Sequence, residues 1–161
     1  MQKVVEANSL MKELLFKSSN SLFPVNKRKI KAEINSFFKN VQMFECEGEK
    51  CFSSEKFFDS NKCNNGDCTS ITNWEWDSNE IYLNKSIIGN RFKESVNIAV
   101  ETIESLLFEK FPRNSFYISV CVQYGDLRNI NIRIYLNRGA PYANVDIEEY
   151  QQPVLNEILN T

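Results

Sequence analysis

Two runs of alternating side chains, at residues 116–124 and 130–136, constrain this fold more than any other feature of the sequence. In each run the apolar residues recur at every second position, and a strand places such residues on one face of a sheet. Gly125 and Asp126 stand between the two runs and favour a turn. We therefore predict an antiparallel hairpin with one buried face and one face in water. The apolar positions are Phe116, Ile118, Val120, Val122, Tyr124, Ile130, Ile132, Ile134 and Leu136.

The buried face of this hairpin needs a cover, and the clearest helix in the sequence lies at residues 91–111. Its apolar residues form one stripe, most of its charged residues lie away from that stripe, and Pro112 ends it. Apolar residues three or four positions apart predict a second helix at residues 26–40. Spacings of three to five predict a further amphipathic helix over residues 3–18.

Two short strands are predicted between the second helix and the long one. Thr72, Trp74 and Trp76 share one side of the first, because they stand two positions apart. Ile81 and Leu83 share one side of the second in the same way.

The remaining segments determine how the chain is organised. Residues 44–77 contain four cysteines and a polar cluster, which indicate an irregular insert. The aliphatic run at 154–159 is too short to assign to a helix or a strand. We predict a single α+β domain over residues 1–161, in which helices pack on one face of an antiparallel sheet.

The charge balance bears on the kind of partner. The chain has 19 Lys and Arg against 21 Asp and Glu, a formal net charge of -2, which is opposite to the balance of a nucleic-acid binder. The basic run at residues 27–31 is interpreted as a solvated helix face. No window reaches the roughly 18 uncharged apolar residues that cross a bilayer, and charges interrupt the N-terminus too early for a secretion signal. We therefore expect a soluble, cytoplasmic protein with no nucleic-acid or membrane partner.

Several kinds of catalytic chemistry lack their usual residues. The sequence contains no histidine, which removes Ser-His-Asp and Cys-His sites and the commonest general base. Its five glycines form neither a dinucleotide fingerprint nor a phosphate loop. Paired carboxylates are present, but helix faces and surface loops produce such pairs by chance. We therefore expect a protein that is not an enzyme, with no catalytic residues.

The cysteines of the insert form two pairs, Cys46 with Cys51 and Cys63 with Cys68, each with four residues between its members. Four thiolates from two turns could complete a tetrahedral structural zinc site, which would fold the insert without leaving an open position for catalysis. Free thiols in a reducing cytoplasm, or one or two local disulfides, remain the alternatives. Cys121 lies in the strand pattern and is interpreted as a packing residue.

An acidic and aromatic run near the C-terminus is the candidate partner-binding segment. It consists of Tyr142, Asp146, Glu148, Glu149 and Tyr150. Tyrosine is enriched at protein interfaces, and fixed carboxylates complement a basic partner. A solvated acidic loop whose tyrosines pack inward is the alternative. The Trp74 and Trp76 pair is a second, weaker candidate, since large aromatic residues are more often core.

The C-terminal part of the chain resembles immunity proteins of bacterial polymorphic-toxin and contact-dependent growth inhibition systems. The resemblance covers about the last 70 residues and combines the long helix, the hairpin and the run Asp146-Ile-Glu-Glu-Tyr150-Gln-Gln-Pro153-Val154-Leu155. It includes no catalytic motif, and the cysteine-bearing insert has no counterpart in it.

This resemblance implies a cytoplasmic protein that binds a cognate toxin C-terminal domain and neutralises it. A nuclease toxin must bind phosphate and tends to be basic, so an acidic inhibitor would gain both steering and complementarity. A small zinc-stabilised protein-interaction adaptor is the alternative function, and an unrecognised enzyme or phage accessory protein ranks third.

Overall fold

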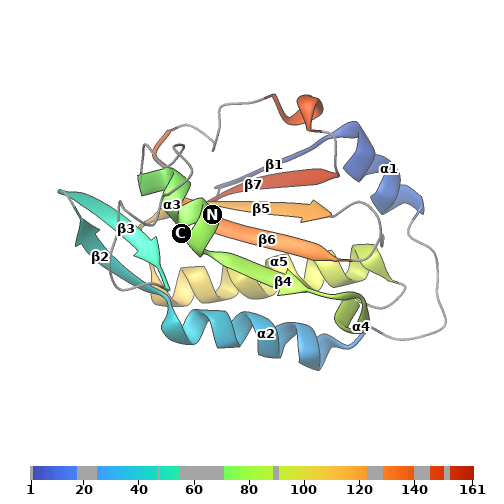
Figure 1. Ribbon diagram of the computed structural model, residues 1–161, viewed down its shortest axis with the longest axis horizontal. Helices are drawn as coiled ribbons and strands as arrows, with labels where there is room; N and C mark the ends of the chain where they lie inside the picture. The colour runs from blue at the N-terminus through green and yellow to red at the C-terminus, as the bar shows by residue number, and fades with distance from the viewer. Residues whose placement is uncertain are drawn as a thin grey trace.

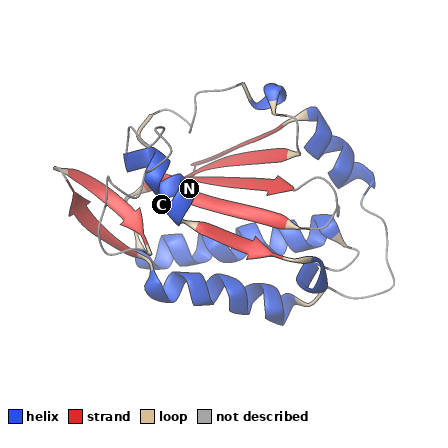
Figure 2. Cartoon of the chain, in the orientation of Figure 1, coloured by secondary structure: helices blue, strands red, loops and turns tan. Residues whose placement is uncertain are grey.

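Antiparallel pairing of strands from both ends of the sequence organises the chain. The computed structural model describes residues 2–17, 25–46, 48–54, 71–88, 91–122, 129–139, 146–150 and 153–161. These residues form a five-stranded sheet, a separate two-stranded sheet and several helices, which confirms the α+β class (Figures 1 and 2). The elements are β1 (Gln2–Ala7), α1 (Ser9–Lys17), α2 (Lys27–Asn40), β2 (Gln42–Cys46), β3 (Glu49–Ser53), α3 (Ile71–Ser78), β4 (Glu80–Leu83), α4 (Lys85–Ile88), α5 (Phe92–Lys110), β5 (Ser115–Val122), β6 (Ile130–Leu136), the 3-10 helix η2 (Ile147–Glu149) and β7 (Val154–Asn160).

The five-stranded sheet has the order β1-β7-β5-β6-β4, and every neighbouring pair is antiparallel. The predicted hairpin is confirmed: β5 pairs with β6, with Ile118 opposite Ile134 and Val120 opposite Ile132. The predicted turn at Gly125 lies outside the described residues. The unassigned run at 154–159 is strand β7, which lies between β1 and β5 (Figure 1).

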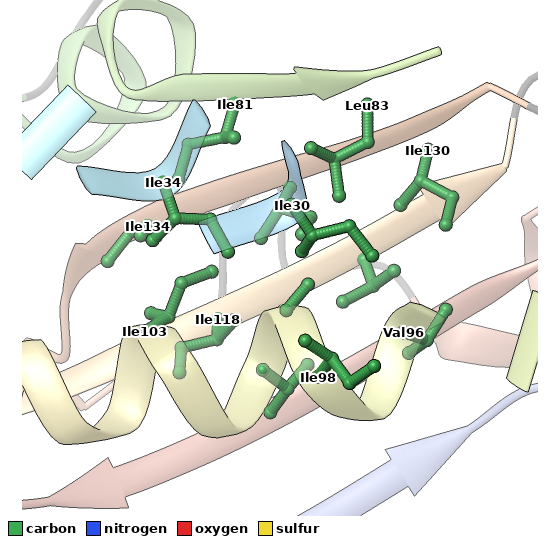
Figure 3. Packing of buried hydrophobic residues seen from close by; sticks show 14 of the residues in the cluster. Ile30, Ile34, Ile81, Leu83, Val96, Ile98, Ile103, Ile118, Ile130 and Ile134 are labelled. Carbon is green, nitrogen blue, oxygen red and sulfur yellow. The ribbon is translucent and has the colours of Figure 1, made fainter. Parts of the chain in front are cut away.

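Helices α2 and α5 cover the aliphatic face of this sheet, as the hairpin pattern predicted (Figure 1). Figure 3 shows how Ile30 and Ile34 of α2 meet the isoleucines of α5, β5 and β6 in one layer. Full burial of one such side chain contributes about 1.5–3 kcal/mol relative to exposure, so this layer dominates the favourable side of folding. Both helices agree with their sequence predictions, and Asn26 caps α2 by accepting a hydrogen bond from the Lys29 amide at 3.1 Å.

The N-terminal helix prediction was wrong for its first half. Residues 2–7 form β1, and the helix begins only at Ser9. All six residues of β1 pair with β7, so a partner from the far end of the sequence overrides the local spacing of the valines. Asn8 separates the two elements, because its side chain accepts a hydrogen bond from the Met11 amide and caps α1.

The predicted strand through Thr72, Trp74 and Trp76 was also wrong, because these residues belong to α3. A helix brings residues three and four apart onto one face, and this places Ile71, Trp74 and Glu75 together in the interior. The next prediction is confirmed, since Ile81 and Leu83 lie on the buried side of β4. The insert is therefore regular at both flanks, in β2, β3 and α3, while residues 55–70 lie outside the described residues.

The second face of the hairpin is not the wet face that the alternation predicted. Tyr117, Ser119, Cys121 and Tyr135 all point to this face and are buried. Tyr117 and Tyr135 stack at 5.1 Å between ring centroids, and Trp76 of α3 meets the Tyr135 ring edge-on at 5.5 Å. Helix α3 thus covers the part of this face that belongs to β6. The alternation within β5 and β6 alone could not indicate this cover.

Candidate functional site

The described part of the predicted partner-binding run forms a short 3-10 helix with its carboxylates exposed. Asp146, Glu148 and Glu149 are exposed, and Tyr150 is half-buried. Asp146 caps the helix, because its side chain accepts a hydrogen bond from the Glu148 amide at 3.0 Å. Tyr142 lies outside the described residues. The run is therefore a defined turn of backbone with acidic side chains in solvent, and its role in binding stays a prediction.

Glu148 ties this turn to the opposite end of the chain. Its carboxylate accepts a hydrogen bond from the Ser9 amide at 2.9 Å, at the first residue of α1, and lies 3.7 Å from the Lys12 ammonium. The hydrogen bond from the Ser9 backbone, followed by that of its side chain and the charge of Lys12, lowers the pKa of Glu148. A carboxylate at a helix N-terminus accepts hydrogen bonds from the free amides and interacts favourably with the positive end of the helix dipole. Glu148 therefore fixes the acidic turn against α1.

Asn8 holds β1, α1 and β7 together beside this turn. The buried Asn8 side-chain oxygen accepts hydrogen bonds from the Met11 amide at 2.9 Å and from the Val154 amide at 3.1 Å. The Asn8 amide in turn donates to the Val154 carbonyl at 3.0 Å. As a result, the acidic turn lies at the C-terminal end of β1 (Figure 1).

Strand β1 forms an edge of the sheet with apolar side chains on both faces. Val4 and Val5 point to opposite faces and are 45% and 48% exposed. Glu6 follows them and is exposed as well. Phe16 of the adjoining α1 is also exposed. Exposed apolar side chains with charged groups beside them are compatible with a protein-binding surface, in which an apolar centre is surrounded by a polar rim.

The four cysteines of the predicted zinc site are only partly described. In the β2–β3 hairpin the backbone of Cys46 pairs with Glu49 and that of Cys51 with Phe44, so both cysteines belong to one antiparallel pair of strands. Cys51 is fully buried and packs with Ile71 and Trp74. Cys63, Cys68 and the side chain of Cys46 lie outside the described residues. The zinc site therefore stays a prediction.

A buried ion pair, which sequence reasoning missed, joins the hairpin to the main sheet. The Glu75 carboxylate has no exposed surface and accepts hydrogen bonds from the Phe52 amide at 2.8 Å and the Leu136 amide at 2.9 Å. Arg138 donates to it from both terminal nitrogens, at 2.7 and 3.0 Å, and also donates to the Lys50 carbonyl at 2.6 Å. The cluster links β3, α3 and the end of β6, and we assign it a structural role.

Some of the polar side chains on the second face of the main sheet are hydrogen-bonded to one another. Ser119 donates a hydrogen bond to Asn156 at 2.7 Å. Burial raises the pKa of the Cys121 thiol, while the Ser119 hydrogen bond and the Arg133 charge oppose that effect. A thiol with a raised pKa is a poor nucleophile, in agreement with a packing role for Cys121. Trp74 is buried, so the weaker aromatic candidate places one of its two rings in the interior.

Comparison with family models, curated proteins and solved structures finds no match to this chain. No helix among the described residues is long and apolar enough to cross a membrane.

Proposed function

We propose that this chain is a cytoplasmic immunity protein that neutralises a cognate toxin domain by direct, non-enzymatic complex formation. One observation carries the proposal: the carboxylates of Asp146, Glu148 and Glu149 stand in solvent on a turn that tertiary contacts hold in place. A fixed charge loses less entropy on binding than a mobile one, so this arrangement favours recognition.

The expected toxin is a basic nuclease domain. A nuclease active site binds phosphate and carries positive potential, and acidic side chains at fixed positions complement that potential. Such complementarity raises the association rate at low ionic strength and weakens as salt screens the charges. The resemblance of the C-terminal part to immunity proteins points to the same class of partner.

The test begins with a pull-down from cells that carry the gene natively, with mass spectrometry of the bound proteins. We expect a single toxin C-terminal domain, bound in equimolar amount, whose toxicity the chain abolishes. Substitution of Asp146, Glu148 and Glu149 by Lys should then slow association at low salt by about tenfold or more. Glu148 also caps α1, so the triple variant removes that cap together with the acidic charges. Glu149→Lys leaves the cap in place and should slow association by a smaller factor.

Glu101→Lys is the matched control, because Glu101 is exposed on α5, in the helical layer that covers the sheet. It makes the same change in net charge as Glu149→Lys, from one negative to one positive side chain, and should leave the association rate nearly unaltered. Equal rates for the wild type and the triple variant at low salt would contradict the assignment of this turn.

A zinc-stabilised adaptor is the second candidate, and its support is that Cys46 and Cys51 lie in two strands that pair as one hairpin. Metal analysis of the purified protein separates the two functions. One equivalent of zinc, no toxin partner and loss of protein binding on chelation would favour the adaptor.

A further inference from the structure

The two edges of the main sheet differ in how they are protected. At the β4 edge one face is covered, because α2 packs against that strand and leaves Ile81 and Leu83 4% and 0% exposed, whereas Tyr82 on the other face is 46% exposed. At the β1 edge Val4 and Val5 are about half exposed on opposite faces. An edge strand with exposed apolar residues on both faces is a template for pairing with another strand.

The register shows which backbone groups β1 presents outward. The Asn8 amide donates to the Val154 carbonyl, and the Asn8–Val154 pair continues the β1–β7 register. In an antiparallel ladder only alternate residues bond to a given neighbour, so Glu6 and Val4 bond toward β7. Lys3, Val5 and Ala7 therefore direct their amide and carbonyl groups away from β7, and no ladder partner is found for them among the described residues.

The charges near β1 indicate what could pair with it. Glu6 is exposed on the strand itself, and the acidic turn lies at the C-terminal end of the strand, where Lys12 offsets part of the Glu148 charge and Asp146 and Glu149 supply the rest (Figure 1). A segment added along β1 would place part of its length beside these carboxylates. Lysine or arginine on that segment would gain favourable interactions there, whereas acidic residues would be repelled.

We propose that β1 is the docking edge for an extended, basic segment of the protein partner, which adds to the sheet as a sixth strand. Backbone hydrogen bonds to Lys3, Val5 and Ala7 would supply affinity, and contacts with Val4, Val5 and the acidic turn would supply selectivity. This inference rests on the proposed function, since it specifies how the toxin domain is recognised.

The test uses two blocked peptides of nine residues, Lys-Lys-Val-Thr-Val-Thr-Val-Lys-Lys and the same sequence with Glu in place of every Lys. Titration of isotope-labelled protein at low salt should perturb the amide signals of Lys3, Val5 and Ala7 and slow their hydrogen exchange. The lysine peptide should bind at least about tenfold more tightly than the glutamate peptide.

Val5→Pro is the discriminating variant. It removes one outward amide without breaking a bond to β7, and proline is tolerated on edge strands. Lysine-peptide affinity should fall about tenfold or more, whereas Val5→Thr, which keeps the amide, should bind nearly as the wild type does. If Val5→Pro does not fold, Val5→Lys should weaken binding by charge repulsion and edge protection.

Four results would overturn the inference: no binding up to about 1 mM, equal binding of both peptides, perturbation confined to other elements, or lysine-peptide affinity that is unchanged in both Val5→Pro and Val5→Lys. Perturbation of the same amides by protein concentration alone would assign the edge to a second copy of the chain. The proposed function fails separately, if no toxin domain is neutralised. Neutralisation without any change in β1 would retain the function and reject this edge.

Discussion

Removal of the Arg138 guanidinium should destabilise the protein strongly, because it leaves a buried carboxylate without its counter-charge. Glu75 is fully buried, and Arg138 approaches it at 2.7 Å. Arg138→Met keeps most of the apolar stem and deletes the charge. Two backbone amides, from Phe52 and Leu136, would then be the only partners of the carboxylate within this cluster.

The magnitude follows from the burial of Glu75. Breaking a buried pair by removal of one partner costs about 3–5 kcal/mol, because the remaining charge stays desolvated. For a chain of this size each kcal/mol lowers the midpoint of thermal unfolding by about 2–4 °C, so we expect a decrease of about 6–20 °C. Urea unfolding at neutral pH, followed by far-ultraviolet circular dichroism, measures the free energy directly.

Arg133→Met is a closely matched control. The Arg133 and Arg138 side chains have the same exposed fraction, 23%, but the partners of Arg133 are Asp77 and Glu80, which are 60% and 35% exposed. Exposed pairs contribute about 0–1 kcal/mol, and the Trp76 ring, 4.9 Å from the guanidinium carbon, adds about 0.5–1 kcal/mol. We expect a loss of about 0.5–2 kcal/mol. Equal losses in the two variants would refute the claim that burial of the carboxylate sets the cost.

Two further predictions concern Asn8 and Cys121. Asn8→Ala should cost about 2–4 kcal/mol in urea unfolding, because α1 loses its cap and the buried Val154 amide loses its acceptor. The exposed cap Asn26, changed to Ala, should cost only about 0.5–2 kcal/mol, and the reverse order would contradict this reasoning. Burial raises the pKa of Cys121 above its ordinary value of 9.0, so the folded state binds this proton more tightly than the unfolded chain does. Stability should therefore decline as pH rises through 9.0 and beyond, and Cys121→Ala should flatten that decline. Urea midpoints measured from about pH 8 to about pH 10 test this, because the wild type and the variant would show the same dependence on pH if the thiol made no contribution.

The parts of the fold that the sequence predicts are those with a strong local period. The alternation of β5 and β6 and the stripe of α5 each extend over many residues, and their partners are close in sequence. Residues 2–7 have no such signal, because Val4 and Val5 are adjacent and fit either a helix or a strand. Pairing with β7, more than 140 residues away, decides between them. Tertiary contacts likewise override the alternation of Trp74 and Trp76 in α3.

The candidate site shows the same division. Composition marked the carboxylates of the acidic run, and they are exposed as a binding role requires. Composition could not indicate that Glu148 caps α1, because the hydrogen bond to Ser9 spans 139 positions. The Glu75–Arg138 pair spans 63 positions and could not be predicted from the sequence for the same reason. An acidic residue in a predicted strand gives no sign that it will be the buried member of an ion pair.

The placement of β7 connects folding to the proposed binding surface. Because β7 lies between β1 and β5, the N-terminal strand joins the sheet only through the C-terminal strand. The β1 edge, the Asn8 hydrogen bonds and the contact of Glu148 with α1 all depend on that junction. Contacts between the two ends of a chain form against a large entropy of loop closure, so we expect this junction to form late. The surface that we propose for the partner would then exist only on a completed sheet, and a partially folded chain would not bind the proposed partner.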